Sequence, residues 1–229
     1  MKTIGMIGGM SWESTAIYYR EANELVRDRL GGLHSAKIAL ASLDFQQISE
    51  LQSADRWNDA AEILAHTAQG LEHAGADMVL ICTNTMHLLV DQVQASVQVP
   101  VLHIGDVAGE AVVAQGLKKV GLLGTAFTME KAFYRDRIAS HGVEVIVPGE
   151  EDRQAVHRAI FDELAIGVSS ESTRARFRSI IDSLVAEGAE GIILGCTEIE
   201  LLVTQADSPV PVFPTAKLHI EAAVNLALS

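Results

Sequence analysis

Basic residues and cysteines are scarce in this chain of 229 residues. There are 17 Lys and Arg against 30 Asp and Glu, which gives a formal net charge of −13 at neutral pH. A surface of that sign repels nucleic acid, so we expect no nucleic-acid partner. The two cysteines, Cys82 and Cys196, lie in different halves of the chain. In the absence of an export signal we expect them to stay reduced, in the cytoplasm.

Long apolar segments are missing as well. No apolar run approaches the length that a membrane-spanning helix requires, so we expect no membrane partner. The first residues lead directly into an apolar segment and a glycine-rich turn, which argues against a signal peptide. Hydrophobic residues nevertheless make up 48% of the chain, and charged residues 21%. That composition predicts a packed globular core.

The usual signatures of cofactor and metal sites are absent. Nothing matches the GxGxxG dinucleotide fingerprint or the Walker pattern, and the eight histidines lack the HExxH spacing of a zinc site. No lysine lies in the motifs that follow the apolar segments, so a pyridoxal phosphate Schiff base is not indicated. We therefore expect neither a cofactor nor a metal ion.

What the sequence does contain is an internal duplication. Residues 71–90 align without a gap on residues 184–203, and this alignment places Thr83 on Cys196. Two further blocks align in the same order: 4–8 with 120–124, and 99–101 with 210–212. Matching blocks in one order over most of the chain indicate a duplicated domain rather than a solenoid array.

Short apolar segments alternate with longer amphipathic ones in both halves. This alternation predicts an α/β fold with parallel sheets, and the continuous apolar character of the short segments agrees with burial on both faces. We expect about four strands in each half: 3–7, 38–43, 78–82 and 99–104, then 120–123, 143–147, 192–194 and 210–213. Helices are expected at 13–30, 54–74, 129–140, 152–164 and 170–187, and from about 216.

Two similar domains follow from this pattern. We place the first at residues 1–103 and the second at 104–214, and the C-terminal helix of about 215–229 could pack back onto the first. In open parallel sheets, ligands bind beyond the carboxyl ends of the strands. The residues that directly follow each apolar segment are therefore the candidates for a functional site.

A glycine-rich turn follows the first apolar segment of the first half, at residues 8–11, and its counterpart in the repeat is the segment 124–128. Such a turn lets backbone N–H groups approach an anion at a helix N-terminus. A plain tight turn explains the pattern equally well. Likewise, Thr125 and Thr128 could simply cap the next helix.

Polar residues follow the third apolar segment of the first half. Thr83, Asn84 and Thr85 carry small side chains that suit the binding of a carboxylate or amino group, although Asn84 or Thr85 could only cap a helix. Cys82 is expected to point into the core. His103, which follows the fourth segment, is interpreted as structural.

In the second half, Cys196 takes the equivalent place, between a strand end and a helix N-terminus. The helix dipole there would favour the thiolate and lower the pKa of the thiol. Glu198 and Glu200 are interpreted as partners of that dipole. If Thr83 and Cys196 face a common cleft, one can remove a proton from a carbon while the other returns one from the opposite face, which inverts a stereocentre.

Three motifs carry a resemblance to a known family: GGMSWEST at 8–15, CTNTMH at 82–87 and GCTEI at 195–199. On these motifs the chain resembles the aspartate/glutamate racemases, the cofactor-independent two-base amino-acid racemases, and above all the bacterial branch acting on L-aspartate and L-glutamate or more broadly. The resemblance implies two flavodoxin-like domains related by a pseudo-twofold axis, with the active site between them. It also implies a homodimer.

The resemblance assigns Thr83 and Cys196 to the two catalytic positions, and many family members have a cysteine where this chain has Thr83. It also implies a substrate pocket lined by Met10, Gln52, Asn84, Thr85, Thr125 and Thr197. Many aspartate-specific members carry a lysine in the segment that corresponds to 160–167, and this chain has none there. That departure favours a broader or longer substrate. Threonine is a poor base, so we expect turnover from the L-enantiomer to be faster than from the D-enantiomer.

Other functions remain open on the sequence. Decarboxylases and cis–trans isomerases of the same superfamily use the same fold, and a single cysteine could protonate an enolate after loss of CO₂. A non-catalytic amino-acid-binding protein is a further alternative, because the replacement of one catalytic cysteine by threonine is compatible with lost activity.

Overall fold

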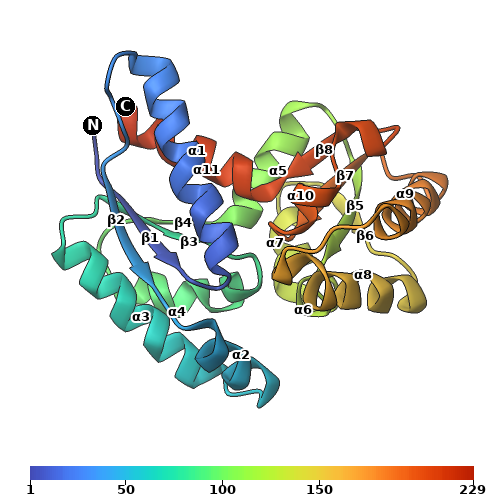
Figure 1. The fold of residues 1–229 in the computed structure, drawn as a ribbon, viewed down its shortest axis with the longest axis horizontal. Helices are drawn as coiled ribbons and strands as arrows, with labels where there is room; N and C mark the ends of the chain where they lie inside the picture. Colours follow the sequence, from blue (N-terminus) through green and yellow to red (C-terminus); the bar gives the residue numbers. More distant parts are fainter. The chain divides into compact units, whose positions relative to one another are not determined.

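The computed structural model describes residues 1–229, which form two four-stranded parallel sheets (Figure 1). The first sheet has the order β2-β1-β3-β4 and the second the order β6-β5-β7-β8. The strands are β1 (Ile4–Gly8), β2 (Ile38–Ser42), β3 (Met78–Ile81), β4 (Val101–Leu102), β5 (Lys119–Gly124), β6 (Glu144–Ile146), β7 (Gly191–Gly195) and β8 (Val212–Pro214). The expected α/β fold with two four-stranded parallel sheets is confirmed. Both sheets repeat one strand order, as a duplication requires.

Eleven α-helices connect and cover the strands. They are α1 (Trp12–Leu30), α2 (Phe45–Ser53), α3 (Trp57–His73), α4 (Val90–Ala95), α5 (Ile104–Ala114), α6 (Ala126–Glu130), α7 (Ala132–Ala139), α8 (Glu150–Asp162), α9 (Glu171–Ala186), α10 (Ile199–Leu202) and α11 (Thr215–Leu228). Three short 3₁₀ helices are η1 (Thr85–Leu89), η2 (Leu164–Ile166) and η3 (Gln205–Asp207). No helix is both long and apolar enough to cross a bilayer.

Several elements differ from the expected ones. The helix expected at 54–74 begins at Trp57, and a separate helix, α2, precedes it. The strand expected at 99–104 is only two residues long, because Ile104 already begins α5. The helix expected at 129–140 is two helices, α6 and α7, with Lys131 between them in an extended conformation. Short apolar runs do not distinguish a strand from a buried helix start, which explains the second of these errors.

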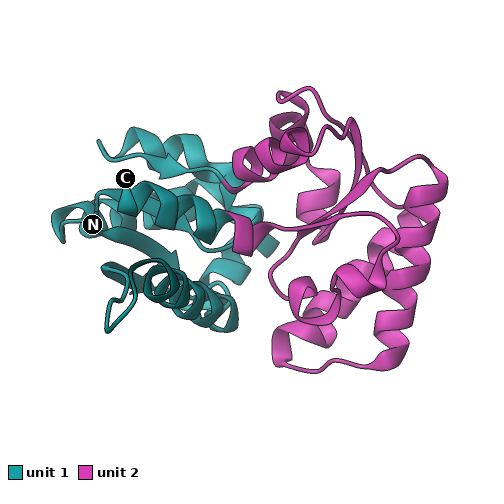
Figure 2. Ribbon diagram, turned by 90° about the horizontal axis from the view of Figure 1, so that it is seen from above, with its two compact units in different colours: residues 1–103, 219–229 teal, residues 104–218 magenta.

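The chain divides into two compact units, coloured separately in Figure 2. Unit 1 consists of residues 1–103 and 219–229, and unit 2 of residues 104–218. The helix that follows β4 therefore belongs to unit 2, whereas most of α11, which follows β8, belongs to unit 1. The helix that follows the last strand of each sheet therefore belongs, wholly or for the most part, to the other unit.

Each sheet is covered on both faces. In unit 1, α1 lies over one face of the sheet and α3 over the other (Figure 1). In unit 2, consecutive residues of β7 enter different clusters. Ile192 and Leu194 pack with α8 and α9, whereas Ile193 packs with α5 and α7. This alternation is the two-sided burial that continuous apolar strands predict.

Candidate active site

The turn after β3 carries Thr83, and the surrounding backbone is tightly held. The Thr83 N–H donates to Ile81 O at 2.8 Å, and Ser14 Oγ, from the first turn of α1, donates to Cys82 O at 3.1 Å. The Thr83 carbonyl lies 2.8 Å from Nδ1 of His87. The Thr83 side chain, by contrast, is only half-buried, and its hydroxyl bonds to no other group of the chain. The backbone of Thr83 is therefore held by hydrogen bonds, whereas its side-chain hydroxyl makes no hydrogen bond to the rest of the chain.

The predicted binding residues of unit 1 lie close to this turn in the fold. Asn84 and Thr85 are buried at the start of η1, and Asn84 makes no side-chain capping bond, so it is not the simple helix cap that the sequence left open. Gln52, on α2, donates from Nε2 to Met86 Sδ at 2.9 Å, which ties α2 to η1. Met10 is buried in the same hydrophobic cluster as Met86.

The turn after β7 carries Cys196, the counterpart of Thr83, and a carboxylate lies directly against the thiol. Cys196 Sγ donates to Glu198 Oε2 at 3.0 Å, and Thr197 Oγ1 donates to the same oxygen at 2.8 Å. Cys196, Thr197 and Glu198 are all buried. Glu198 is therefore a hydrogen-bond partner of the thiol, a role that we did not predict when we interpreted it as a partner of the helix dipole.

The electrostatics of Cys196 act against the lowered pKa that a helix dipole would give its thiol. Burial raises the pKa of the Cys196 thiol well above its ordinary value, and the charge and hydrogen bond of Glu198 raise it further. The backbone N–H groups of Glu198 and Ile199 act in the opposite direction but are outweighed. The following helix, α10, has only four residues, so its dipole is too small to reverse this balance. The resting cysteine is a neutral thiol.

The glycine-rich turns have the geometry of tight turns. Gly9 has φ +88°, and a Cβ there would lie 2.1 Å from Leu43 O, so only glycine fits. In unit 2, Thr125 is the N-cap of α6, and its side chain accepts from Thr128 N. The capping interpretation therefore accounts for the position of Thr125, although its side chain is buried at the same end of the sheet as Cys196.

Two of the remaining candidates have structural roles. Cys82 is buried, and burial raises the pKa of its thiol, so it is an inert core residue as expected. Glu200, in α10, accepts from Ala216 N at 2.8 Å and so joins α10 to the start of α11. His103 is buried, and its ring centroid lies 4.9 Å from that of His87.

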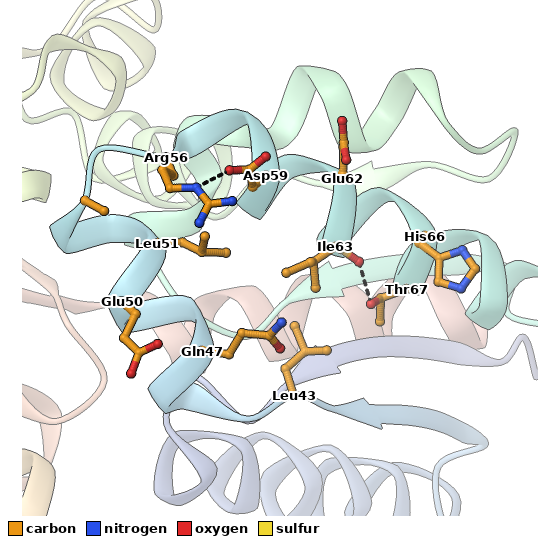
Figure 3. Close-up of a pocket in the computed structure, with 11 residues that line it drawn as sticks. Leu43, Gln47, Glu50, Leu51, Arg56, Asp59, Glu62, Ile63, His66 and Thr67 are labelled. Carbon is orange, nitrogen blue, oxygen red and sulfur yellow. Dashed lines mark hydrogen bonds and ion pairs between the residues drawn. The ribbon is translucent and has the colours of Figure 1, made fainter.

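A cavity of about 900 Å³ lies elsewhere in unit 1, between α2 and α3 (Figure 3). Its walls include Leu43, Leu51 and Ile63, and its rim carries Arg56 paired with Asp59. None of the predicted site residues lines it. A smaller groove of about 360 Å³ lies in unit 2 between α8 and α9, the two helices that occupy the same place in the repeat. The two grooves therefore lie between corresponding helix pairs of the two units.

A duplicated α/β fold with two four-stranded parallel sheets matches the two-domain structures of Asp/Glu racemases. A profile of the Asp/Glu/Hydantoin racemase family matches residues 7–223, nearly the whole chain. The chain belongs to this family of racemases.

Individual relatives agree with this membership. The broad-specificity amino-acid racemase RacX of Bacillus subtilis is 25% identical over 231 residues, covering 99% of this chain and 98% of RacX. A candidate Asp/Glu racemase from Yersinia pestis is 50% identical, with a TM-score of 0.95 and full coverage of both chains. An aspartate racemase homologue from Pyrococcus horikoshii is 37% identical, with a TM-score of 0.88 and full coverage of both chains.

Proposed function

We propose that this protein racemises a small amino acid without a cofactor, with Cys196 and Thr83 as the two acid/base groups. The observation that carries the assignment is their equivalence. Each follows the third strand of its sheet, at the edge where parallel strands present ligand-binding residues. The hydrogen bond between Cys196 and Glu198 supports it further, because it joins a thiol to a proton acceptor.

On this proposal Cys196 removes the α-proton of the L-enantiomer. The thiol first gives its proton to Glu198, which already accepts its hydrogen bond. The thiolate that results is held by the backbone N–H groups of Glu198 and Ile199 and takes the proton from carbon. The negative charge passes to the substrate, where N–H groups and hydroxyls at the strand ends stabilise it.

Thr83 completes the reaction by returning a proton to the opposite face of the carbon. Its hydroxyl donates this proton and accepts another from solvent water, which the half-buried position of the side chain allows. Glu198 then releases its proton to solvent, so that protons balance over one turnover. A hydroxyl donates to a carbanion far more readily than it abstracts a proton from carbon. Because the two free enantiomers have equal free energy, kcat/KM is the same in both directions, and the asymmetry appears as a higher kcat from L-substrate with a correspondingly higher KM.

We propose L-aspartate, L-glutamate or a broader set of amino acids as substrates. Support comes from the relatives, one named for broad specificity and one as an aspartate racemase homologue. The buried polar residues Asn84, Thr85 and Thr197 suit the two charged groups that every amino acid carries. The segment 160–167 contains no lysine, which supports the broader set.

Exchange of the substrate α-proton with deuterated solvent tests the assignment. The wild-type enzyme is expected to exchange the α-proton of L-substrate and to form D-product, with a lower initial rate from D-substrate when each enantiomer is saturating. Cys196→Ala is expected to abolish exchange from L-substrate, whereas Cys82→Ala, which alters the other buried cysteine, should retain it. Retained exchange in Cys196→Ala removes Cys196 as the base. Binding without exchange in the wild type identifies a non-catalytic binder.

We also propose a cytoplasmic homodimer. The two free cysteines fit a reducing compartment. Several large apolar side chains of α1 and the segment after it are exposed, namely Trp12, Tyr19, Leu30, Leu33 and Leu40. Sedimentation equilibrium of wild type and of Tyr19→Glu measures this, and an unchanged dimer in the variant excludes this face.

A further inference from the structure

His87 lies four residues after Thr83 and is buried within η1. Its Nδ1 is 2.8 Å from the Thr83 carbonyl oxygen. A carbonyl oxygen only accepts hydrogen bonds, so Nδ1 carries the proton and donates it to Thr83 O. Together with the bond from Ser14 Oγ to Cys82 O, this places a side-chain donor on each of the two peptide groups that flank Thr83.

The surroundings keep the His87 ring neutral and immobile. Its centroid lies 4.9 Å from that of His103 and 5.7 Å from that of His219. His219 is itself fixed, because Nε2 lies 3.0 Å from Leu102 O and Nδ1 lies 3.0 Å from the hydroxyl of Tyr18. Burial, and then the neighbouring His103 and His219, lower the pKa of His87, and these effects outweigh the hydrogen bonds of the ring to the carbonyls of Thr83 and Leu102, which raise it. The Nδ1–H donor therefore has one fixed direction.

The repeat shows that this arrangement is peculiar to the threonine half. His87 aligns with Glu200 when Thr83 aligns with Cys196. Glu200 bonds to Ala216 N, and the carbonyl of Cys196 accepts from the backbone N–H of Ile199. A side chain thus bonds the carbonyl of Thr83, whereas a backbone N–H bonds that of Cys196. Cys196 has Glu198 to assist its chemistry, but the Thr83 hydroxyl has no such partner and depends on its placement alone.

We infer that His87 is a positioning residue, which holds the Thr83 backbone so that its hydroxyl returns a proton to the substrate carbon. This inference rests on the proposed racemase function and assigns a residue to one of its two half-reactions. Misplacement by about 1 Å at a reacting group is enough to cost roughly a hundredfold in rate. Loss of the bond should therefore affect the return of the proton by Thr83 and leave its removal by Cys196 intact.

Two substitutions separate the hydrogen bond from the packing of the ring. In His87→Asn the side-chain amide nitrogen takes the place of Nδ1 and can still donate to Thr83 O. In His87→Gln the amide nitrogen lies further out, near the place of Nε2, and cannot. For each variant, L-substrate is incubated in deuterated buffer, and deuterated L-substrate and D-product are measured together. The ratio of deuterated L-substrate to D-product reports how often exchange occurs without inversion.

We expect His87→Gln to raise the ratio of exchange to inversion at least tenfold, with total α-exchange and KM for L-substrate within about threefold of wild type. His87→Asn should return the ratio to within about threefold of wild type. A parallel fall of exchange and inversion in both variants, or an unchanged ratio in His87→Gln, overturns the positioning role. Absence of exchange in the wild-type enzyme is a separate result, which overturns the proposed function and this inference with it.

Discussion

On the proposed mechanism, the chemistry of Cys196 depends on Glu198, which accepts the hydrogen bond of the thiol. Sequence placed Cys196 at a strand end and matched it to Thr83, because both positions follow from the repeat. It could not show that the Glu198 carboxylate turns back toward the sulfur, since a carboxylate near a helix start has an equally good reason to face the backbone. The side-chain conformation, and with it the raised pKa of the thiol, became visible only in the structure.

Glu198→Gln tests this dependence through two measurements: the reactivity of the Cys196 thiol should rise, whereas the rate of racemisation should fall. The carboxylate raises the pKa of the Cys196 thiol, so its neutral replacement should lower that pKa, and alkylation by iodoacetamide should begin at lower pH. Racemisation should nevertheless fall by about a hundredfold or more, because the proton acceptor is lost.

Glu200→Gln is the matched control. Glu200 accepts a hydrogen bond from Ala216 N, and a glutamine oxygen can accept the same bond. Its racemisation rate should stay within about threefold of wild type. A Glu198→Gln enzyme with wild-type racemisation would show that the thiol gives its proton elsewhere.

At the scale of elements, the sequence predicted the strands that form the site better than the helices around them. β1, β3, β5 and β7 lie where continuous apolar runs end in glycine or small polar residues. The segment of α5, by contrast, is rich in valine, alanine and glycine and has little polar alternation, so its helical nature depends on packing in unit 2 rather than on its own pattern. α2 was missed because it is short and directly precedes α3.

The turn after β1 gives a prediction about local structure. Gly9→Ala should destabilise the protein by roughly 2 kcal/mol or more, because a Cβ at φ +88° would lie 2.1 Å from Leu43 O. Gly70→Ala, inside α3, is the matched substitution. Its Cβ meets nothing within 4 Å, so it should stabilise by about 0.5–1 kcal/mol. Urea unfolding of both variants measures the difference, and equal stabilities would show that the turn tolerates a side chain.

At the scale of the whole molecule, the sequence shows the duplication. It does not show to which of the two units each helix belongs. Periodicity shows which face of a helix is apolar and does not specify the sheet on which that face packs. α11 illustrates this, because its residues from His219 onward belong to unit 1, whose other residues are 1–103. The Lys2 N–H donates to Ala227 O at 2.8 Å, which joins the two ends of the chain within that unit.

His219 makes this junction sensitive to pH. It is buried, and burial lowers its pKa to about 4, whereas the unfolded chain takes up the proton near pH 6.5. Between these values the unfolded state binds more protons than the folded state, so the free energy of unfolding falls as the pH falls. One such proton corresponds to about 1.4 kcal/mol per pH unit, or roughly 3 kcal/mol by pH 4. His87, whose pKa is also lowered, adds a loss of the same sign.

His219→Gln isolates this contribution. The glutamine amide can occupy the place of Nε2 and donate to Leu102 O, as His219 does, but it does not titrate. It also removes one of the neighbours that lower the pKa of His87, so both histidine contributions should shrink together. Free energies of unfolding from urea titrations between about pH 6.5 and pH 4.5 should therefore fall less steeply in the variant, by up to about 1.4 kcal/mol per pH unit. The carboxylates of the chain titrate in both proteins and cancel in the comparison. Identical slopes would mean that His219 is protonated in the folded protein as easily as in the unfolded chain, and that the buried histidines do not couple the stability of unit 1 to pH.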